Sequence, residues 1–247
     1  MKFLLRLFIQ FSLSFLISAC KPLQVSDFSA TKFNLKPDYP VDSSMWKFIS
    51  PYRDSLSAVM NVVIGKNDSE LVKAQPEGTL GNFVADALLI QARKELNTQI
   101  DFSIMNNGGI RIPSLHAGEI TVGDVFELMP FDNGIATVEC SGKIVKQLFD
   151  KAAAKGGWPI SNAQFMIMKG AAEQIYINNQ KLDTLESYRF VCSDYIANGG
   201  DDCSFLLSQK KTLSEILFRN LIMDYIRDLT SEGKTISAKI EHRVINE

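Results

Sequence analysis

Residues 106–111, with the sequence NNGGIR, combine residue types that suit the binding of a polar ligand. Gly108 and Gly109 have no side chains, so their backbone N–H groups can approach a ligand closely. The amide of Asn106 offers a donor and an acceptor, and the guanidinium of Arg111 offers a two-pronged contact to a phosphate. The pattern is neither a Walker A loop nor a dinucleotide fingerprint. Taken alone, it also fits a tight turn with a surface arginine.

A phenylalanine, Phe131, lies in the loop-like sequence MPFDN (129–133), outside any helical or strand-like run of apolar residues. A phenylalanine on a loop either plugs the core or offers a flat face to a ligand. Stacking on a nucleobase contributes about 1–3 kcal/mol. From these residues alone, the core plug is the simpler interpretation.

A second polar loop, SDYIANGGDD (193–202), follows the apolar run RFVCS. It carries a ring (Tyr195), an amide (Asn198), two glycines and two carboxylates (Asp201 and Asp202). A carboxylate can accept hydrogen bonds from both hydroxyls of a ribose. The same composition is also common in simple turns. Adjacent carboxylates diverge, so we do not interpret the two as an acid–base pair.

Asn82 and Asp86 lie one helical turn apart in PEGTLGNFVADA (76–87), on one face of an expected helix. We interpret both as structural. Asn82 is expected to cap and orient the helix start, and Asp86 is expected to brace the neighbouring loop.

Helices and strands that would position these loops follow from the apolar periodicity. Helices are expected at 42–63, 81–97, 143–155 and 212–230. Asp42 or Ser43 should cap the first helix, Pro51 should kink or split it, and Gly156 and Gly157 should stop the third. Thr121, with Asp124, should cap a short helix within 120–128.

Strands are expected at 101–106, 134–142, AQFMIM (163–168), EQIYI (173–177) and YRFVCS (188–193), with a weak final strand at 236–245. This mixture predicts an α/β (α+β) domain.

The chain has 247 residues, 46% hydrophobic and 22% charged, with a formal net charge of −2. Such a composition provides a core but no basic field that would attract a nucleic acid polymer. A small anionic ligand needs only one or two placed arginines.

The first twenty residues have the pattern of a secretory signal, with Lys2 and Arg6 ahead of an apolar stretch at 7–17 and small residues before Cys20. The apolar stretch is shorter than the roughly 20 residues that span a membrane. The sequence ISAC resembles a bacterial lipobox, which predicts lipidation of Cys20; a plain signal peptide is the alternative. We therefore expect a signal peptide at 1–20, a polar tether at 21–41 and a folded domain at 42–247.

Three cysteines remain, Cys140, Cys192 and Cys203, so they cannot all pair within the chain. Buried free thiols are the simplest interpretation of the first two, and one disulfide is possible. The histidines, His116 and His242, lie far apart, so no metal site is expected on this chain.

Four motifs occur in a set order: G-N-x-x-x-D from Gly81, N-x-G-G-I-R from Asn106, P-F-x-N from Pro130, and an aromatic followed by A-N-G-G-D from Tyr195. This order resembles the C-terminal domain of the 5′-nucleotidase family, which includes UDP-sugar hydrolases and 2′,3′-cyclic phosphodiesterases. The resemblance covers about residues 42–230. It implies a layered fold with mixed sheets covered by helices.

The resemblance implies that Phe131 and Tyr195 sandwich a base, that Asn106 reaches the base, that Arg111 contacts the phosphate or ribose side, and that Asp201 accepts the ribose hydroxyls. The expected ligand residues are Asn106, Gly108, Gly109, Arg111, Phe131, Tyr195, Asn198 and Asp201. Some family members have a further arginine ahead of the first motif. This sequence has KAQPEGT there, with Lys73 nearby.

Full-length family members also carry a metallophosphoesterase domain with D-x-H and G-N-H-D/E motifs, which hold two divalent metals. Those motifs do not occur in this sequence. The resemblance therefore implies no cofactor on this chain, with the divalent metals on a separate metallophosphoesterase partner.

The resulting hypothesis is the nucleotide-binding specificity domain of a split 5′-nucleotidase-type hydrolase in nucleotide catabolism. It would be exported, with a nucleotide as its ligand, and anchored by lipid to a bacterial membrane. The first alternative is a stand-alone nucleotide-binding lipoprotein without catalysis. The second is a degenerate domain with a structural role.

Overall fold

The structure is a computed structural model that describes residues 29–30, 32 and 40–247. The expected signal peptide with Cys20, and nearly all of the expected tether, lie outside the described residues. The chain divides into the units Met1–Phe48 and Ile49–Glu247, and the sheets and pockets described below belong to the second. Among the described residues, no helix has the length and apolarity needed to cross a membrane.

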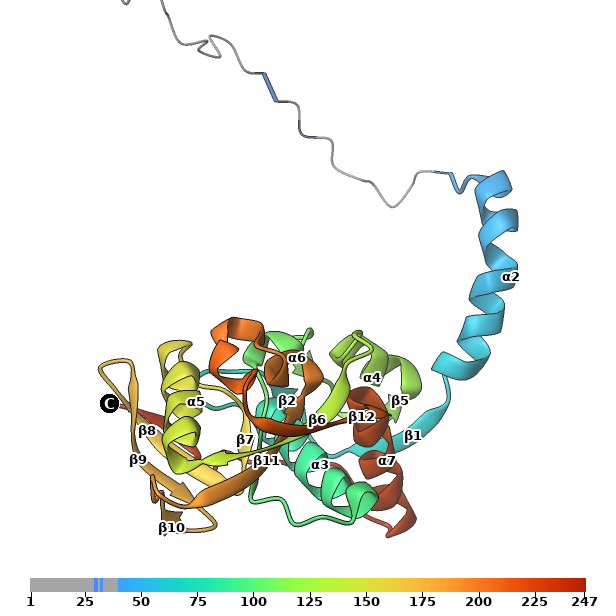
Figure 1. The fold of residues 1–247 in the computed structure, drawn as a ribbon. Coiled ribbons are helices and arrows are strands. Elements are labelled where there is room, and N and C mark those ends of the chain that lie inside the picture. Colours follow the sequence, from blue (N-terminus) through green and yellow to red (C-terminus); the bar gives the residue numbers. More distant parts are fainter. Residues whose placement is uncertain (1–28, 31, 33–39) are drawn as a thin grey trace, which may run out of the picture. The chain divides into compact units, whose positions relative to one another are not determined.

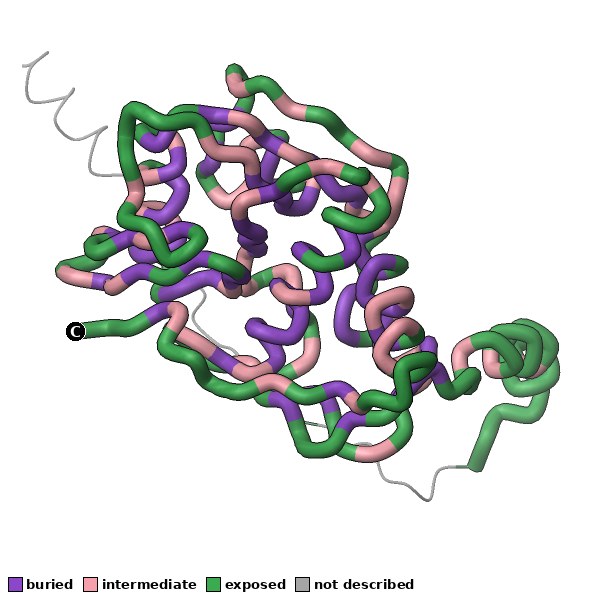
Figure 2. Tube along the Cα trace, turned by 90° about the horizontal axis from the view of Figure 1, so that it is seen from below, coloured by how far each residue is buried: buried purple, intermediate pink, exposed green. Residues whose placement is uncertain are grey.

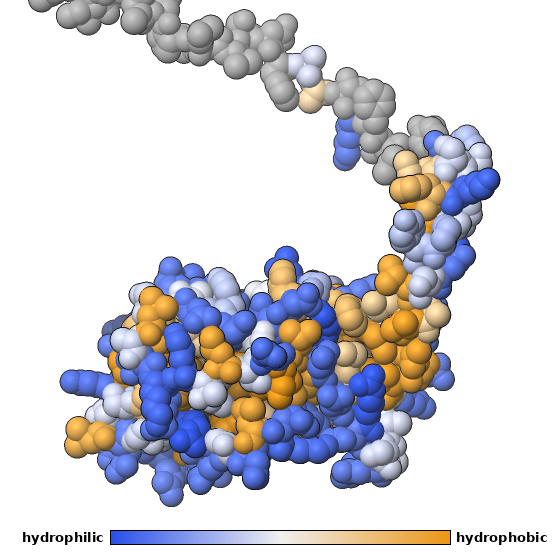
Figure 3. Space-filling view, turned by 45° about the vertical axis from the view of Figure 1, so that its right-hand side comes forward, coloured by the Kyte–Doolittle hydropathy of each residue, from blue (hydrophilic) through white to orange (hydrophobic). Residues whose placement is uncertain are grey.

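Helix α2 (Ser43–Met60) begins where Asp42 caps it, because the Asp42 carboxylate accepts the N–H groups of Ser44 and Met45 at 2.9 and 3.0 Å. The helix continues through Pro51, so the proline does not split it. No residue of α2 is buried, and Figure 3 shows apolar side chains along it beside hydrophilic ones.

The central sheet has five strands in the order β12-β6-β11-β3-β7 (Figure 1). Strand β3 (Phe102–Ile104) runs parallel to β11 (Ser187–Ser193). The other neighbours are antiparallel: β6 (Gly134–Ser141) and β12 (Lys210–Leu217) on one side, and β7 (Ile160–Ser161) on the other. The strands predicted at 101–106, 134–142 and 188–193 are therefore confirmed.

A second sheet has the order β10-β9-β8-β13. Its strands are β8 (Ala163–Met168), β9 (Ala171–Ile177), β10 (Gln180–Lys181) and β13 (Val244–Asn246). Two small antiparallel pairs join β1 (Val63–Asn67) to β5 (Gly118–Thr121) and β2 (Leu71–Val72) to β4 (Ser114–Leu115). The strands β1, β2, β4, β7 and β10 were not predicted from the sequence.

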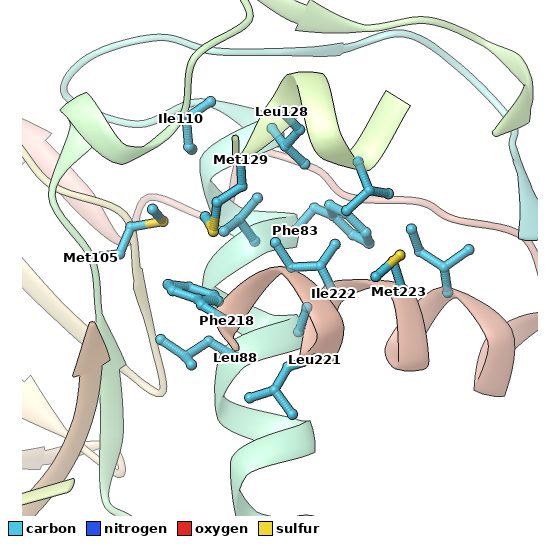
Figure 4. Close-up of a cluster of buried hydrophobic side chains, with 14 of the residues drawn as sticks. Phe83, Leu88, Met105, Ile110, Leu128, Met129, Phe218, Leu221, Ile222 and Met223 are labelled. Atoms are coloured by element: carbon cyan, nitrogen blue, oxygen red, sulfur yellow. The ribbon is translucent and has the colours of Figure 1, made fainter. Parts of the chain in front are cut away.

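The central sheet buries both faces, and alternate residues of one strand enter two different cores. Val191 of β11 packs into the core of α3 (Thr79–Leu96), α4 (Val122–Leu128) and α7 (Phe218–Ser231). Phe190 packs into the core of α5 (Gly142–Ala154) and the second sheet. Figure 4 shows part of the first core, with Phe83 and Phe218 among its side chains, and Figure 2 shows how the buried stretches gather at the centre.

The prediction of a helix at 212–230 is wrong over the first third of that range. Residues 210–217 form strand β12, which pairs antiparallel with β6, and the helix begins only at Phe218. A helix and a strand both fit the spacing of Leu213, Ile216 and Leu217. The pairing of this segment with β6 makes it a strand. Leu213 is 54% exposed, so it is not part of a core stripe. The final strand is likewise shorter than predicted, covering Val244–Asn246.

The three described cysteines are free and buried. Burial raises the pKa of Cys140 to about 12 and that of Cys203 to about 11, and it raises the pKa of Cys192 as well. These thiols therefore behave as small apolar core residues, and the possible disulfide is not formed.

Candidate functional site

Several loops meet at one edge of the central sheet because of its strand directions. The carboxyl ends of the parallel strands β3 and β11 lie at the same edge, and Asn106 and Tyr195 follow them. Strand β6 is antiparallel to β11, with Ile135 opposite Ser193, so Phe131 enters the same edge from the other direction. Strand β7 starts there too, with Ile160 opposite Ile104. Loops far apart in sequence are thus brought side by side.

A pocket of about 570 Å³, called the main pocket below, lies among these loops. Its lining residues are Gln75, Asn106, Asn107, Gly108, Gly109, Arg111, Phe131, Asn133, Lys155, Trp158, Tyr195 and Asp201. Seven of the eight predicted ligand residues are among them. The pocket belongs to the size range of small-molecule sites.

Two aromatic rings are presented at the main pocket. Phe131 is 44% exposed and Tyr195 is 47% exposed, so neither is packed away in a core. The Tyr195 ring is backed by the chain at Gly200, where an added Cβ would lie 2.5 Å from the ring. The guanidinium carbon of Arg111 lies 5.4 Å from the centre of the Phe131 ring. The simple core-plug interpretation of Phe131 is therefore wrong.

Buried Arg219, at the start of α7, holds the loop that carries Phe131. Its Nη1 donates to the carbonyl oxygens of Met129 and Phe131 at 3.3 and 3.2 Å, and its Nη2 donates to Asp132 at 2.6 Å. Its guanidinium also lies 4.0 Å from the centre of the Phe126 ring. No local pattern indicates this role, because the apolar spacing places Arg219 inside the helix expected at 212–230.

The polar loops are joined to each other at the rim of the main pocket. Asn106 Nδ2 donates to Asp201 Oδ2 at 2.7 Å, and the backbone N–H of Asp201 donates to the Tyr195 hydroxyl at 3.2 Å. Asp201 and Asp202 have φ values of 50° and 64°, in the left-handed region that costs most residues energy. The turn is thus held in a conformation that presents one carboxylate to Asn106.

Two cations lie close to the 106–111 loop: Arg111, which lines the main pocket, and Lys73, which does not. Arg111 donates through Nη1 to the Gly108 carbonyl at 3.3 Å, and Lys73 donates through Nζ to the Ile110 carbonyl at 2.7 Å. Burial and the nearby charge of Arg111 lower the pKa of Lys73 below its usual value. Both cations are therefore close to the backbone of the 106–111 loop and to each other.

Gln75 fixes the wall that contains Trp158. Its Nε2 donates to the carbonyl oxygens of Lys155 and Gly157 at 2.7 and 2.9 Å. Gly157 has a φ of 106°, and a Cβ there would lie 2.5 Å from the Pro76 carbonyl, so only glycine fits.

Five lining residues were not predicted as ligand residues: Gln75, Asn107, Asn133, Lys155 and Trp158. Asn107 and Asn133 lie inside the quoted motifs, which was the available signal. Lys155 is the last residue of the helix expected at 143–155, and Gln75 and Trp158 lie where neither a helix nor a strand is predicted.

Asn198 is the predicted ligand residue that does not line the main pocket. It is exposed, and its backbone N–H donates to the Asp194 carbonyl at 2.9 Å at the end of α6 (Asp194–Ala197). Its position shows it ending a short helix.

Asn82 and Asp86 have structural contacts, with partners that differ from those expected. Asn82 lies inside α3, which is capped at Gly78, and donates to Glu77 and the Lys239 carbonyl at 2.6 and 2.9 Å. Asp86 forms a two-pronged ion pair with Arg243 at 2.7 and 2.8 Å and accepts from the Ser161 hydroxyl. It therefore holds the C-terminal segment and β7 instead of the 106–111 loop.

The helix α4, which leads into the Phe131 loop, begins with the capping box that the sequence predicts. Asp124 accepts from the Thr121 backbone N–H at 2.7 Å, and the Thr121 hydroxyl accepts from the Asp124 N–H at 3.2 Å. His116 Nε2 lies 3.3 Å from Asp124.

The described residues do not fit a divalent metal. Over residues 29–30, 32 and 40–247, no group of three or more His, Cys, Asp or Glu side chains could hold one.

Comparison with known proteins finds one family. A model described as 5′-nucleotidase, C-terminal domain, matches residues 59–208. A 5′-nucleotidase of Vibrio parahaemolyticus is 31% identical over 171 residues, which is 65% of this chain and 29% of that protein. Protein UshA of Escherichia coli is 26% identical over 170 residues, covering 67% of this chain and 30% of that protein.

A similar solved structure is the 5′-nucleotidase precursor of Thermus thermophilus, with a TM-score of 0.73 and 24% identity over 84% of this chain and 44% of that one. The likeness shows a shared fold and confirms the predicted class of mixed sheets covered by helices. The chain spans about three-tenths of the length of the curated relatives that it matches.

Proposed function

This chain belongs to the family of 5′-nucleotidase C-terminal domains, and from that premise we propose that its main pocket binds a nucleotide through the nucleoside. The base would lie between Phe131 and Tyr195, with Asn106 at its edge. Asp201 would accept the ribose hydroxyls, and Arg111 would contact the phosphate side. The single observation that supports this proposal best is the convergence of these side chains on one pocket from three separate loops.

Each group has a physical fit to its proposed role. Two half-exposed rings offer stacking faces to a flat heterocycle. The Asn106–Asp201 bond holds an amide and a carboxylate side by side, and the carboxylate retains acceptor capacity for hydroxyl groups. Arg111 lies beside Phe131, so a ligand stacked on the ring would bring its charged end near the guanidinium.

For catalysis, we propose that this chain is the specificity part of a split 5′-nucleotidase-type hydrolase in nucleotide catabolism. A separate metallophosphoesterase chain would supply the divalent metals. The match to the C-terminal domain of the 5′-nucleotidase family supports the role of this chain in nucleotide binding. This chain would position the nucleotide and so lower the entropic cost of the reaction.

We also propose that residues 1–20 are an export signal, that Cys20 is lipidated, that 21–41 is a tether and that 42–247 is the binding domain. Mass spectrometry of the protein from the native membrane tests the anchor. The expected result is an N-terminal Cys20 with attached acyl chains, lost in Cys20→Ala. An unmodified N-terminus at another residue would contradict the anchor and leave the binding proposal intact.

Two measurements test the function. Calorimetric titration with adenosine, AMP, uridine and UMP should give saturable binding of at least one nucleoside and its nucleotide. The chain is then purified with the product of the adjacent gene and assayed for phosphate release with Mn²⁺ or Zn²⁺.

Turnover should require both chains. If the chain binds a nucleotide but no metallophosphoesterase partner gives phosphate release with it, the stand-alone nucleotide-binding lipoprotein is favoured instead. If no nucleoside or nucleotide binds, with or without the partner, the nucleotide-binding proposal is wrong.

A further inference from the structure

A second pocket, of about 290 Å³, lies at the sheet formed by β8, β9, β10 and β13 and shares no lining residue with the main pocket. It is called the Tyr176 pocket below, and its polar lining residues are Asn162, Gln164, Tyr176, Asn179, Glu241 and Arg243. Figure 1 shows β8, β9 and β10 at the end of the domain away from α7. The proposed nucleotide binding uses none of these side chains.

Strand pairing places an aromatic ring beside an amide in the Tyr176 pocket. Tyr176 of β9 lies directly opposite Gln164 of β8 in the antiparallel register, so both side chains lie on the same face of the sheet. Their neighbours along the strands, Phe165 and Ile177, are buried in the core. The face with Tyr176 and Gln164 therefore points away from the core, and it presents a ring and an amide to solvent.

The carboxylate of Glu241 is fixed at the Tyr176 pocket by the surrounding protein. Its Oε2 accepts from Nε and Nη2 of Arg243 at 3.0 and 2.7 Å, and the Glu241 backbone N–H donates to Glu77 at 2.9 Å. Within the described part of the chain, the other carboxylate oxygen, Oε1, accepts no hydrogen bond. This oxygen is an acceptor in a fixed position, so a ligand would lose little free energy in ordering it.

The guanidinium of Arg243 has no donor left for an anionic ligand, because all five of its N–H groups are engaged. Nη1 donates to Asp86 and the Ile160 carbonyl at 2.7 and 2.9 Å. Nη2 donates to Asp86 at 2.8 Å, and the two remaining N–H groups donate to Glu241. Among the described residues that line this pocket, no other is a cation. The pocket therefore does not suit a phosphate or a carboxylate.

The remaining polar groups of the Tyr176 pocket suit hydroxyl groups. In the described part of the chain, the side chains of Gln164, Tyr176 and Asn179 form no hydrogen bond with another protein group. An amide offers donors and an acceptor, and each hydroxyl of a ligand does the same, so neighbouring hydroxyls can pair with an amide and a carboxylate oxygen. The face of an aromatic ring carries partial negative charge and attracts the C–H groups of a ligand that packs on it.

The two walls of the Tyr176 pocket are joined through asparagines. Asn178 and Asn179 have φ values of 51° and 61° and form the two-residue turn between β9 and β10, the geometry of a tight hairpin. The side-chain amide of Asn162, between β7 and β8, donates to Asn178 and to the Asp101 carbonyl. The hairpin tip is therefore tied to the β7–β8 junction, which holds the pocket in one shape.

We propose that the Tyr176 pocket binds a neutral saccharide, with one pyranose ring packed on Tyr176 and its hydroxyl groups bonded to Glu241 and Gln164. The ring, the amides and the free carboxylate oxygen match the C–H and O–H groups of a sugar, and the engaged guanidinium disfavours an anion. The pocket volume is at the lower end of small-molecule sites, which suits a single sugar ring. The same chemistry recognises a free sugar and a sugar unit of a glycan.

The test uses the full chain, purified in a detergent without a sugar headgroup so that the detergent does not occupy the pocket. Saturation-transfer NMR and calorimetry are carried out with D-glucose, D-galactose, D-mannose and N-acetyl-D-glucosamine. At least one should bind saturably, with a dissociation constant of about 1 mM. The methyl glycoside of that sugar distinguishes the two sources, because it should bind equally well if the ligand is a glycan unit and less well if it is the free sugar.

Matched variants then locate the binding. Tyr176→Ala should weaken sugar binding about tenfold through the lost ring, and Tyr176→Phe should weaken it less than about threefold. Gln164→Ala should weaken binding about fivefold, the order of magnitude of a lost hydrogen bond. The control is Gln180→Ala, an exposed amide of β10 that does not line the pocket and should bind as wild type does. Thermal unfolding of each variant shows whether the fold is retained.

Two results would overturn the proposal. The first is the failure of all four sugars to bind wild type at about 50 mM, well above a millimolar dissociation constant. The second is sugar binding that is unchanged in both Tyr176→Ala and Gln164→Ala, which would place the sugar elsewhere. Because the two pockets share no residue, neither result depends on whether the main pocket binds a nucleotide.

Discussion

The two rims of the main pocket differ in how their charges are compensated. On the rim of residues 194–202, Asp201 is bonded to Asn106, and Asp202 lies 3.4 and 3.7 Å from Lys155 and Lys151. At the 106–111 loop, called the basic rim below, the side-chain hydrogen bonds of Arg111 and its neighbour Lys73 go to carbonyl oxygens. Asp202 of the acidic rim is therefore paired with lysines, whereas the cations of the basic rim donate to neutral carbonyl oxygens.

This difference indicates which rim discriminates by charge. A carboxylate that accepts one hydrogen bond from the protein, as Asp201 does from Asn106, keeps acceptor capacity for the hydroxyl groups of a ligand. A rim with unpaired cations gains a new charge-assisted contact when an anion binds, and such contacts are roughly twice as strong as neutral ones. We therefore expect phosphate dependence to follow Arg111, and sugar dependence to follow Asp201.

The largest expected effect is that of Arg111→Met. Methionine retains apolar contact with Phe131 but removes the guanidinium. Nucleotide affinity should fall by about 3 kcal/mol, the order of magnitude of a two-pronged contact to a charged group. Affinity for the free nucleoside should change little. Calorimetry with the nucleoside and its nucleotide measures both, and equal losses would contradict a phosphate-side role for Arg111.

The aromatic pair should have the next largest effect. Tyr195→Ala and Phe131→Ala should each reduce nucleoside affinity by about 2 kcal/mol, the usual range for a lost stacking face. Tyr195→Phe is the control, because it keeps the ring and removes only the hydroxyl that accepts the Asp201 N–H. The loss should be similar for nucleoside and nucleotide. A loss restricted to the nucleotide would mean that these rings support the basic rim and do not hold the base.

The loops and their chemistry could be predicted from the sequence, because glycines, amides and aromatics outside periodic runs are local signals. Phe131 and Tyr195 are examples, and the strand directions then explain why they meet. Asn198, inside an equally suggestive loop, ends a helix instead. The amino acid type does not reveal which side of a turn a side chain occupies.

Residues that depend on tertiary contacts could not be predicted. Arg219 supports the Phe131 loop from the start of α7, 88 positions further along the chain. Gln75 reaches carbonyl oxygens 80 and 82 positions away. The apolar spacing within strand β12 predicts a helix and also fits a strand, and only the pairing of this segment with β6 decides between the two. No local pattern encodes these partners.

The acidic rim should give a smaller effect. Asp201→Asn keeps an oxygen that can accept from Asn106 Nδ2 but removes the negative charge. Affinity for the ribonucleoside should fall by about 1 kcal/mol, the net value of a typical hydrogen bond. The 2′-deoxynucleoside should lose less, because it lacks one of the hydroxyls that the carboxylate would accept. If both ligands lose affinity equally, Asp201 shapes the loop and does not bind the ribose.

The smallest expected effect comes from changing the N-terminal cap of α4, the helix that leads into the Phe131 loop. Thr121→Ala removes the cap of α4 and should lower the free energy of unfolding by about 1 kcal/mol.

The pH dependence of the free energy of unfolding has a definite sign at the partner of Thr121, Asp124. Burial raises the Asp124 pKa, but the hydrogen bonds from Thr121 and His116 outweigh burial and lower the pKa below its usual value. A carboxyl with a lowered folded pKa stabilises the fold above its unfolded pKa, and this contribution disappears as the pH falls through the folded pKa.

Thermal unfolding measured between neutral pH and about pH 3 should therefore show a steeper acid loss for wild type than for Asp124→Asn, because the amide does not titrate across the usual range of an aspartate pKa. Nucleoside binding by Thr121→Ala, measured at neutral pH, tests whether the two rims have separate roles. Because α4 leads to Phe131 and not to Asp201, base stacking should weaken while the advantage of ribonucleoside over deoxynucleoside stays at its wild-type value. A change in that sugar preference would mean that the two rims are coupled through the sheet edge, and that the charge difference between them does not divide their roles.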